Sequence, residues 1–204
     1  MKRVWCVLLA LAACRAVAPP ETVRYSRITA RGAVPECTFT VRPEEGGWSL
    51  LSVTGKLTVE THYDLSERLV RARAAQGGDS ARVEVTGDRL KVVRSNGEQE
   101  FDAPPGIIVT SAPDWADTFR ICRLWKRSVR GRQDFPGLWI HPVQPAQRLT
   151  FTAERIGSDG KLDQLSIRLR GNSAYVAWVD EGGRMIKLAS LPVKEGSTVL
   201  VLEE

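Results

Sequence analysis

The chain has 204 residues, of which 43% are hydrophobic, 26% charged and 7% aromatic. This composition is typical of a folded globular protein and excludes a disordered chain, a collagen-like chain and a multi-pass membrane protein. The net charge is +5, but acidic residues are interspersed with the basic ones. Because no known DNA- or RNA-binding motif accompanies this charge, we expect no nucleic-acid partner.

The first thirteen residues have the pattern of a secretory signal peptide. Met1–Arg3 is short and basic, and Val4–Ala13 is an unbroken apolar run followed by small residues. The run is too short to span a bilayer as a helix, which takes about 20 residues. We therefore expect residues 1–13 to be a signal peptide and exclude them from the fold.

The end of the apolar run, Leu11-Ala12-Ala13-Cys14, resembles the bacterial lipobox. This resemblance implies that Cys14 is diacylated, becomes the mature N-terminus and anchors the protein in a membrane. By the lipoprotein-sorting rule, Arg15 in place of Asp implies the periplasmic face of the outer membrane in a Gram-negative cell. The alternative is cleavage after Ala18, which would leave a soluble periplasmic or secreted protein. The resemblance to ordinary signal peptidase sites disfavours this cut, because Pro19 would follow it directly.

The region after the lipobox is predicted to be a tether. Residues 14–35 include Pro19, Pro20 and Pro35 among charged and small residues, with neither a helical nor a strand period. We expect one β-rich domain over residues 36–204, because this length supports a single sizeable core.

Most of the predicted domain alternates between apolar and polar residues with a period of two, which is typical of half-buried strands. The clearest segments are Cys37–Val41, Leu57–Tyr63, Arg82–Thr86 and Leu165–Leu169. Turn residues separate such segments at intervals of about ten residues, which predicts a largely antiparallel, mainly β fold. Strands after residue 174 are apolar on both faces, so we expect them to be central or covered.

One segment predicts an amphipathic helix. Ser111 resembles a helix N-cap, and Trp115, Phe119, Cys122 and Trp125 then recur at helical spacing. The helix should end near Trp125. The most economical arrangement packs its aromatic face against the concave side of a curved sheet.

The order of these elements resembles exported bacterial families of unknown function that share the open half-barrel of the lipoprotein-carrier (Lol) superfamily. The resemblance covers about residues 48–204 and rests on Ser111–Trp115 and on a Trp-Asp-Gly-Arg turn within Tyr175–Leu188. It implies an antiparallel meander that forms an open half-barrel wrapped around one helix. It carries no catalytic residue.

Two cysteines fall in the predicted domain, Cys37 and Cys122. Each lies on the apolar side of its element, and an exported protein folds in an oxidising compartment, so we expect a Cys37–Cys122 disulfide. Two Cys and two His without ligand spacing do not make a zinc site, and we expect neither a metal nor a cofactor.

The chain offers little support for catalysis. His62 shares the polar face of an alternating strand and is expected to be solvated. His141 follows an aromatic-rich segment, and Asp114 or Asp117 would be its orienting carboxylate in an envelope hydrolase. No Gly-x-Ser-x-Gly elbow, phosphate loop or His-Glu-x-x-His motif accompanies it, so the hydrolase is the alternative hypothesis.

Aromatic and basic residues suggest binding instead. Trp115, Phe119, Trp125 and Trp139 are either core residues or the lining of an apolar groove for a lipid or acyl chain. The basic residues Arg120, Arg123, Lys126, Arg127 and Arg130 form either a solvated helix face and loop or a contact with anionic headgroups or glycan. We expect a non-catalytic carrier, scaffold or binding module whose ligand is a lipid or an envelope protein.

Overall fold

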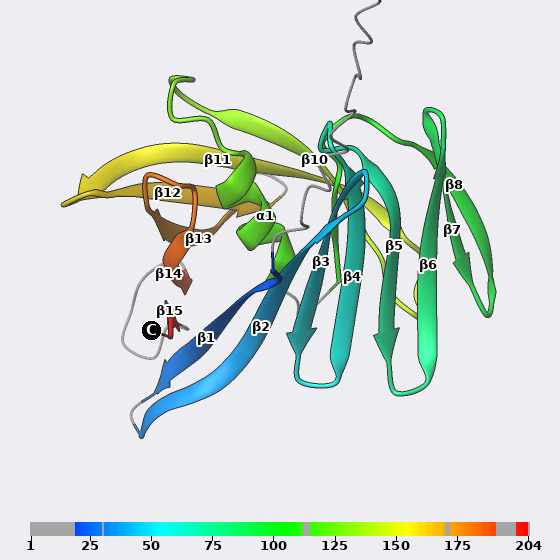
Figure 1. Ribbon diagram of the computed structural model, residues 1–204, viewed down its shortest axis with the longest axis horizontal. Coiled ribbons are helices and arrows are strands. Elements are labelled where there is room, and N and C mark those ends of the chain that lie inside the picture. Colours follow the sequence, from blue (N-terminus) through cyan, green and yellow to red (C-terminus); the bar gives the residue numbers. More distant parts are fainter. Residues whose placement is uncertain (1–18, 30, 112–114, 170–171, 191–198, 204) are drawn as a thin grey trace, which may run out of the picture.

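The computed structural model describes residues 19–29, 31–111, 115–169, 172–190 and 199–203 (Figure 1). The predicted signal peptide, the lipobox and Cys14 lie outside these residues. The predicted tether is wrong from Glu21 onward, because Glu21–Thr29 forms a strand and the next strand begins at Gly32. Val23 and Tyr25 of this first strand point into the core, which explains why the segment is ordered despite its prolines.

The described residues form fifteen strands and one helix. The strands are β1 (Glu21–Thr29), β2 (Gly32–Glu44), β3 (Gly47–Thr54), β4 (Leu57–Asp64), β5 (Leu69–Gln76), β6 (Asp79–Thr86), β7 (Arg89–Arg94), β8 (Gly97–Asp102), β9 (Ile108–Thr110), β10 (Gln133–Trp139), β11 (Gln147–Asp159), β12 (Leu162–Leu169), β13 (Asn172–Val179), β14 (Met185–Ser190) and β15 (Val199–Leu202). The helix α1 is Ala116–Leu124. The predicted mainly β class is confirmed.

All described strands belong to one open sheet with the order β8-β7-β6-β5-β4-β3-β2-β1-β15-β14-β13-β12-β11-β10-β9. Neighbouring strands are antiparallel except β9 and β10, which are parallel. The pairing of β1 with β15 places the last strands of the chain in the middle of the sheet. This confirms the prediction that the apolar C-terminal strands are central.

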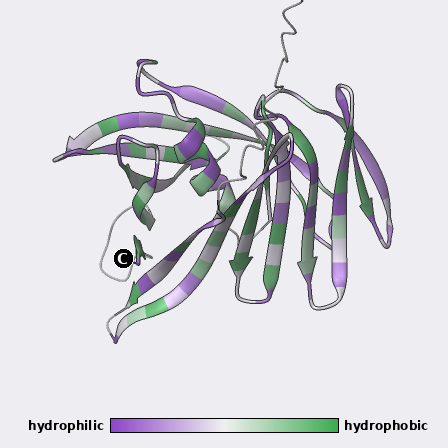
Figure 2. Cartoon of the chain, in the orientation of Figure 1, coloured by the Kyte–Doolittle hydropathy of each residue, from purple (hydrophilic) through white to green (hydrophobic). Residues whose placement is uncertain are grey.

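The alternation of apolar and polar residues in the sequence matches the two faces of the sheet, because successive side chains of a strand point to opposite faces. Along β4, Leu57, Val59, Thr61 and Tyr63 are buried, while the residues between them are half-exposed. Figure 2 shows the same alternation of hydrophobic and hydrophilic residues along the long strands. The strand predictions are therefore confirmed in type and position.

The helix begins later than the sequence indicates. Its N-cap residue is Trp115, which makes no side-chain capping hydrogen bond, so the prediction of Ser111 as the cap is wrong. Asp117 in the first turn accepts the Thr118 amide hydrogen bond and so satisfies one of the amides that a helix start leaves free. The helix ends at Leu124 with Trp125 as C-cap, as predicted.

Two hydrophobic clusters form the interior. The first, here called the helix-side core, joins α1 to β1–β3 and β9–β15. Its buried members are Val23, Tyr25, Cys37, Phe39, Val41, Leu50, Ile108, Ala116, Phe119, Ile121, Cys122, Phe135, Leu149, Phe151, Ala153, Leu165, Ile167, Ala177, Val179, Met185, Leu188 and Leu200.

The second cluster, here called the meander core, lies between β4–β7 and the β9–β10 pair. Its buried members are Leu57, Val59, Tyr63, Leu69, Ala72, Ala74, Ala81, Val83, Leu90, Val92, Ile107, Val109, Leu138, Ile140 and Ala146. Consecutive residues of β9 serve different clusters, because Ile108 packs in the helix-side core and Val109 in the meander core. The edge strand β9 is thus covered on both faces.

Candidate functional site

The edge strand β8 meets the start of β11 through side chains rather than through a backbone ladder. The side-chain oxygen of Gln99 on β8 accepts a hydrogen bond from the Ala146 amide at 2.7 Å. Asp102, at the end of β8, pairs with Arg148 on β11 at 2.7 Å. We call this junction the seam. A junction made of side chains leaves room that a continuous sheet would fill.

The first hollow at the seam has a volume of about 500 Å³ and lies where the β4–β5 and β6–β7 turns meet the segment after β8. It is lined by Asp64, Arg68, Leu69, Val70, Val85, Gly87, Asp88, Ala103, Pro104, Pro105 and Ile107. Two unusually exposed apolar side chains belong to the turn and strand at its edge, Leu65 (82% exposed) and Val70 (47%). We call it the end hollow.

The second hollow has a volume of about 350 Å³ and lies between the end of β8 and strands β10 and β11. It is lined by Phe101, Asp102, Pro104, Ile107, Pro136, Gly137, Leu138, Arg148, Leu149 and Thr150. We call it the side hollow. The two hollows share Pro104 and Ile107, so they are neighbours on either side of one short segment. Volumes of this size are common for small-ligand sites.

The segment between the hollows is fixed by the backbone. The Ala103 amide donates to the Asp88 carbonyl at 2.7 Å, and the Ile107 amide donates to the Pro104 carbonyl at 3.3 Å. Gly106 between them has a φ of +72°, a conformation that favours glycine. This turn keeps Ile107 buried at the base of both hollows.

Charged side chains surround these apolar walls. Arg68 and Asp88 line the end hollow, and Asp102 and Arg148 line the side hollow. The hydrogen bond from Arg148 and the charge of Arg148 hold the pKa of Asp102 below its usual value, so this carboxylate stays ionised. The arrangement of apolar walls and a charged rim suits a ligand that has an apolar part and a polar head.

The structure places the predicted groove residues elsewhere. Phe119 is 3% exposed and stacks on Phe39 with ring centroids 4.7 Å apart, so it fills the helix-side core. Trp115 packs edge-on against Tyr175, and Trp139 stacks on His141. These residues, together with the partly buried Trp125, pack against the helix-side core, and none lines a seam hollow.

The two histidines have structural partners. His62 is not the solvated residue expected, because its ring lies between Glu44 at 3.0 Å and Glu60 at 3.4 Å. His141 accepts hydrogen bonds on Nδ1 from the amides of Val143 and Gln144, which form its own turn.

Asp117 does not orient His141. Its carboxylate interacts with Thr118 and Thr110, and among the described residues no hydrogen bond joins it to a histidine. Asp114 lies outside the described residues. Burial raises the pKa of Asp117 to about 6 despite these hydrogen bonds. The described residues therefore do not assemble the hydrolase site of the alternative hypothesis.

The basic run is divided between three environments. Arg120 is buried, so it does not belong to the solvated helix face that was one of the two alternatives for the basic run. Arg127 is held by Asp163, whereas Arg123, Lys126 and Arg130 are exposed and have no carboxylate partner among the described residues.

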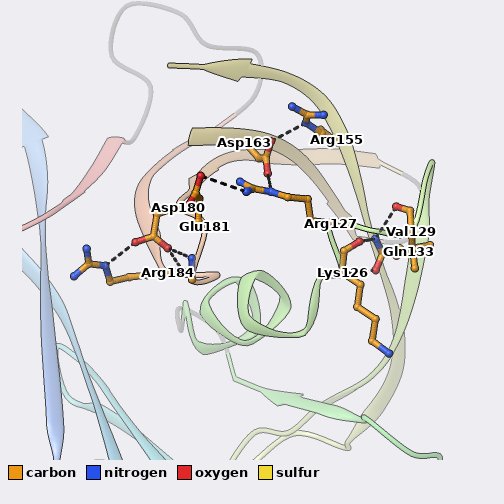
Figure 3. Close-up of polar contacts among 10 residues, drawn as sticks. Lys126, Arg127, Val129, Gln133, Arg155, Asp163, Asp180, Glu181 and Arg184 are labelled. Atoms are coloured by element: carbon orange, nitrogen blue, oxygen red, sulfur yellow. Dashed lines mark hydrogen bonds and ion pairs between the residues drawn. The ribbon is translucent and has the colours of Figure 1, made fainter. Parts of the chain in front are cut away.

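Figure 3 shows how Asp163 holds the loop after the helix. Its side chain is 4% exposed and receives Arg127 at 2.5 Å and Arg155 at 2.7 Å. Gln133 completes the loop by accepting the Lys126 amide hydrogen bond and donating to the Lys126 carbonyl. These contacts connect the end of α1 to β10–β12, so part of the basic run has a structural role.

Arg120 occupies a site that the sequence did not reveal. Its guanidinium carbon lies 4.6 Å from the centre of the Trp48 ring and 4.3 Å from that of Tyr63, and its Nη2 pairs with Glu67 at 2.5 Å. Trp48 and Tyr63 stack on each other across β3 and β4. The one sequence signal for the burial of Arg120 is its place between two apolar residues of the helix, Phe119 and Ile121.

The predicted disulfide is not formed in this structure. Cys37 and Cys122 both lie buried in the helix-side core, but they are not joined. Burial raises the pKa of the Cys122 thiol, which therefore stays protonated and packs as a small apolar group.

Within the described part of the chain, no group of three or more His, Cys, Asp or Glu side chains is placed to hold a metal ion. In the same part of the chain, α1 is neither long nor apolar enough to cross a bilayer, and no other segment forms such a helix.

No family model matches the chain, and no curated protein matches it. The fold is similar to the crystal structure of a DUF1089 family protein from Pseudomonas aeruginosa, with a TM-score of 0.45, 17% sequence identity and coverage of 91% of this chain and 95% of that one. This match does not confirm the predicted relation to the lipoprotein-carrier superfamily, which stays a prediction.

Proposed function

We propose that this protein is a non-catalytic binding module that holds the apolar part of an amphipathic ligand, such as a lipid or an acyl chain, at the seam. The observation that carries the proposal is the pair of neighbouring hollows that share Pro104 and Ile107. Their walls combine apolar side chains such as Leu69, Ile107 and Leu138 with charged ones. In this combination an acyl chain contacts the apolar side chains while a polar head stays in contact with charge.

The proposed site differs from the groove beside the helix that the sequence suggested. The stacking of Phe119 on Phe39 supports a filled interior there. In this proposal the open sheet acts as a half-barrel whose helix is part of the core, and the ligand binds where the ends of the sheet approach each other. The exposed Leu65 and Val70 then extend the apolar surface that an acyl chain contacts.

The binding proposal is tested with a fluorescent fatty acid, 11-(dansylamino)undecanoate. Val70→Asp places a charge at the end hollow and should weaken probe binding about tenfold. The matched control is Val34→Asp on β2, because Val34 is also an exposed strand valine (43%) and lines neither hollow. Equal affinities of the two variants, or no binding by the wild type, would contradict the proposal.

We also propose that the module acts at the cell envelope, attached through a lipid on Cys14. The lipobox resemblance of Leu11–Cys14 supports this location. Two acyl chains anchor a protein stably, since each buried CH₂ contributes about 0.8 kcal/mol. Growth with an alkyne analogue of palmitate should label the wild type but not Cys14→Ser, and the variant should be recovered in the soluble fraction. An unlabelled wild type in the soluble fraction would contradict the anchor.

A further inference from the structure

We propose that Arg120 and Arg123 form a binding site for a phosphate monoester, in which Glu67 is an internal counterion that the ligand replaces. The site lies between α1 and the β4–β5 turn, whose residues Asp64 and Arg68 also line the end hollow. Its affinity test uses phosphate probes without an acyl chain, so its failure can be told apart from the failure of the acyl-binding proposal.

The first part of the argument is the position of Arg120. The side chain is 2% exposed and its guanidinium group lies against two stacked aromatic rings, so it is held in one orientation. Its Nη2 reaches Glu67, and its Nε is buried without a hydrogen-bond partner among the described residues. A buried guanidinium with unused donor capacity is suited to bind a second anionic oxygen.

The second part is the strained and half-exposed position of the present partner. Glu67 is the only described residue other than glycine with a positive φ, at 63°, and its side chain is 49% exposed. Glu67 in this strained conformation therefore covers the Nη2 end of the buried Arg120 guanidinium from the solvent side. If the Glu67 side chain rotated into solvent, Nη2 of Arg120 would become accessible to another anion.

The third part is an excess of positive charge. Arg123 follows Arg120 by three residues, so the two side chains leave the same side of the helix. The guanidinium carbon of Arg123 lies 5.7 Å from the centre of the same Trp48 ring, and Arg123 has no carboxylate partner among the described residues. Arg120 and Arg123 both contact Trp48, and of the two only Arg120 has a carboxylate partner among the described residues. A phosphate monoester has enough oxygens to accept hydrogen bonds from both guanidinium groups.

The experiment measures affinity by calorimetric titration with inorganic phosphate and with glycerol 3-phosphate at constant ionic strength. Glu67→Gln removes the competing charge and should bind either probe about tenfold more tightly than the wild type. Arg123→Gln should bind about tenfold more weakly. Arg130→Gln is the matched control, because Arg130 is an exposed cation of the loop after α1 without a carboxylate partner among the described residues, and it should bind as the wild type does.

A second variant guards against misfolding of the turn. Glu67→Gly also removes the carboxylate and relieves the positive φ, which offsets part of the stability that is lost when the buried Arg120 has no carboxylate partner, and it should show the same gain in affinity. Equal affinities of the wild type, both Glu67 variants and Arg123→Gln would overturn the proposal. An equal loss in Arg130→Gln and Arg123→Gln would also overturn it, because binding would then follow net charge alone.

Vesicles distinguish the two sources of the phosphate group. If the ligand is a lipid head, the protein without residues 1–18 should co-sediment with phosphatidylcholine vesicles that contain phosphatidic acid, and Arg123→Gln should reduce this binding. If the ligand is a free phosphate monoester, glycerol 3-phosphate should bind without co-sedimentation. Absence of both kinds of binding would overturn the proposal.

Discussion

A Cβ atom on Gly183 would lie 3.2 Å from the carbonyl oxygen of Cys122, so the turn between β13 and β14 packs directly against the last turn of α1. Gly183 also has a φ of +80°. Asp180 fixes this turn by accepting the amide hydrogen bonds of Gly182 and Arg184 (Figure 3). The Trp-Asp-Gly-Arg segment singled out in the sequence is therefore a docking turn for the helix.

We predict that Gly183→Ala destabilises the protein by about 2–3 kcal/mol, because it adds both backbone strain and a close contact with the helix. Gly160→Ala is the control, since Gly160 has a φ of +61° but open space around its Cβ position. It should cost only the strain, about 1 kcal/mol. Urea unfolding of the two variants measures the difference. If both variants lose the same stability, the packing of Gly183 against the helix contributes nothing.

Asp163 is predicted to be the residue that holds the loop after α1. Asp163→Asn should cost about 2–3 kcal/mol, because it leaves Arg127 and Arg155 without their shared buried carboxylate. The pair of Asp134 with Arg132 is exposed on both sides, so Asp134→Asn should cost less than about 1 kcal/mol. Thermal melts of both variants test this ranking. A larger loss for Asp134→Asn would show that the buried pair is not the stronger one.

The stability of the protein should depend on the titration of Asp117, whose pKa is raised to about 6 by burial. Because the folded state holds this proton more tightly than the unfolded state, the contribution of Asp117 is complete below about pH 4 and is lost as the pH rises through 6. Asp117→Asn keeps an oxygen acceptor for Thr118 without the charge. At pH 7.5 it should be more stable than the wild type by on the order of 2 kcal/mol.

Urea unfolding from pH 4 to pH 8 checks the Asp117 prediction. The wild type should lose stability relative to Asp117→Asn between pH 4 and pH 6, and the difference should be constant above pH 7. A difference that does not change with pH would show that the Asp117 carboxyl titrates alike in both states.

Phe119 is predicted to be a core residue, not a groove residue. Phe119→Ala should cost about 3–5 kcal/mol, because it leaves a cavity opposite Phe39 in the helix-side core. It should leave binding of the dansylated fatty acid at the seam unchanged. A small loss of stability accompanied by altered probe binding would instead favour the groove beside the helix.

The strands could be predicted because one face of each strand is buried, so apolar residues recur at every second position of the sequence. Strand β1 was missed because Pro19 and Pro20 precede it, although Val23 and Tyr25 show the alternation. The environment of Arg120 could not be predicted, since its partner Glu67 lies 53 residues away and only the fold brings the two together. The seam hollows are lined by segments that lie far apart in the sequence, from Asp64 to Thr150, and no local pattern predicts that they meet.

The most direct test of the binding proposal is photo-crosslinking with a fatty acid that carries a diazirine in its chain, followed by mass spectrometry of the labelled peptides. The proposal predicts labels within residues 64–70, 85–88, 101–107, 136–138 and 148–150, which contain the lining residues of the seam hollows. An excess of unlabelled fatty acid should remove these labels. Labels concentrated on α1, or labels that the unlabelled fatty acid does not remove, would contradict ligand binding at the seam.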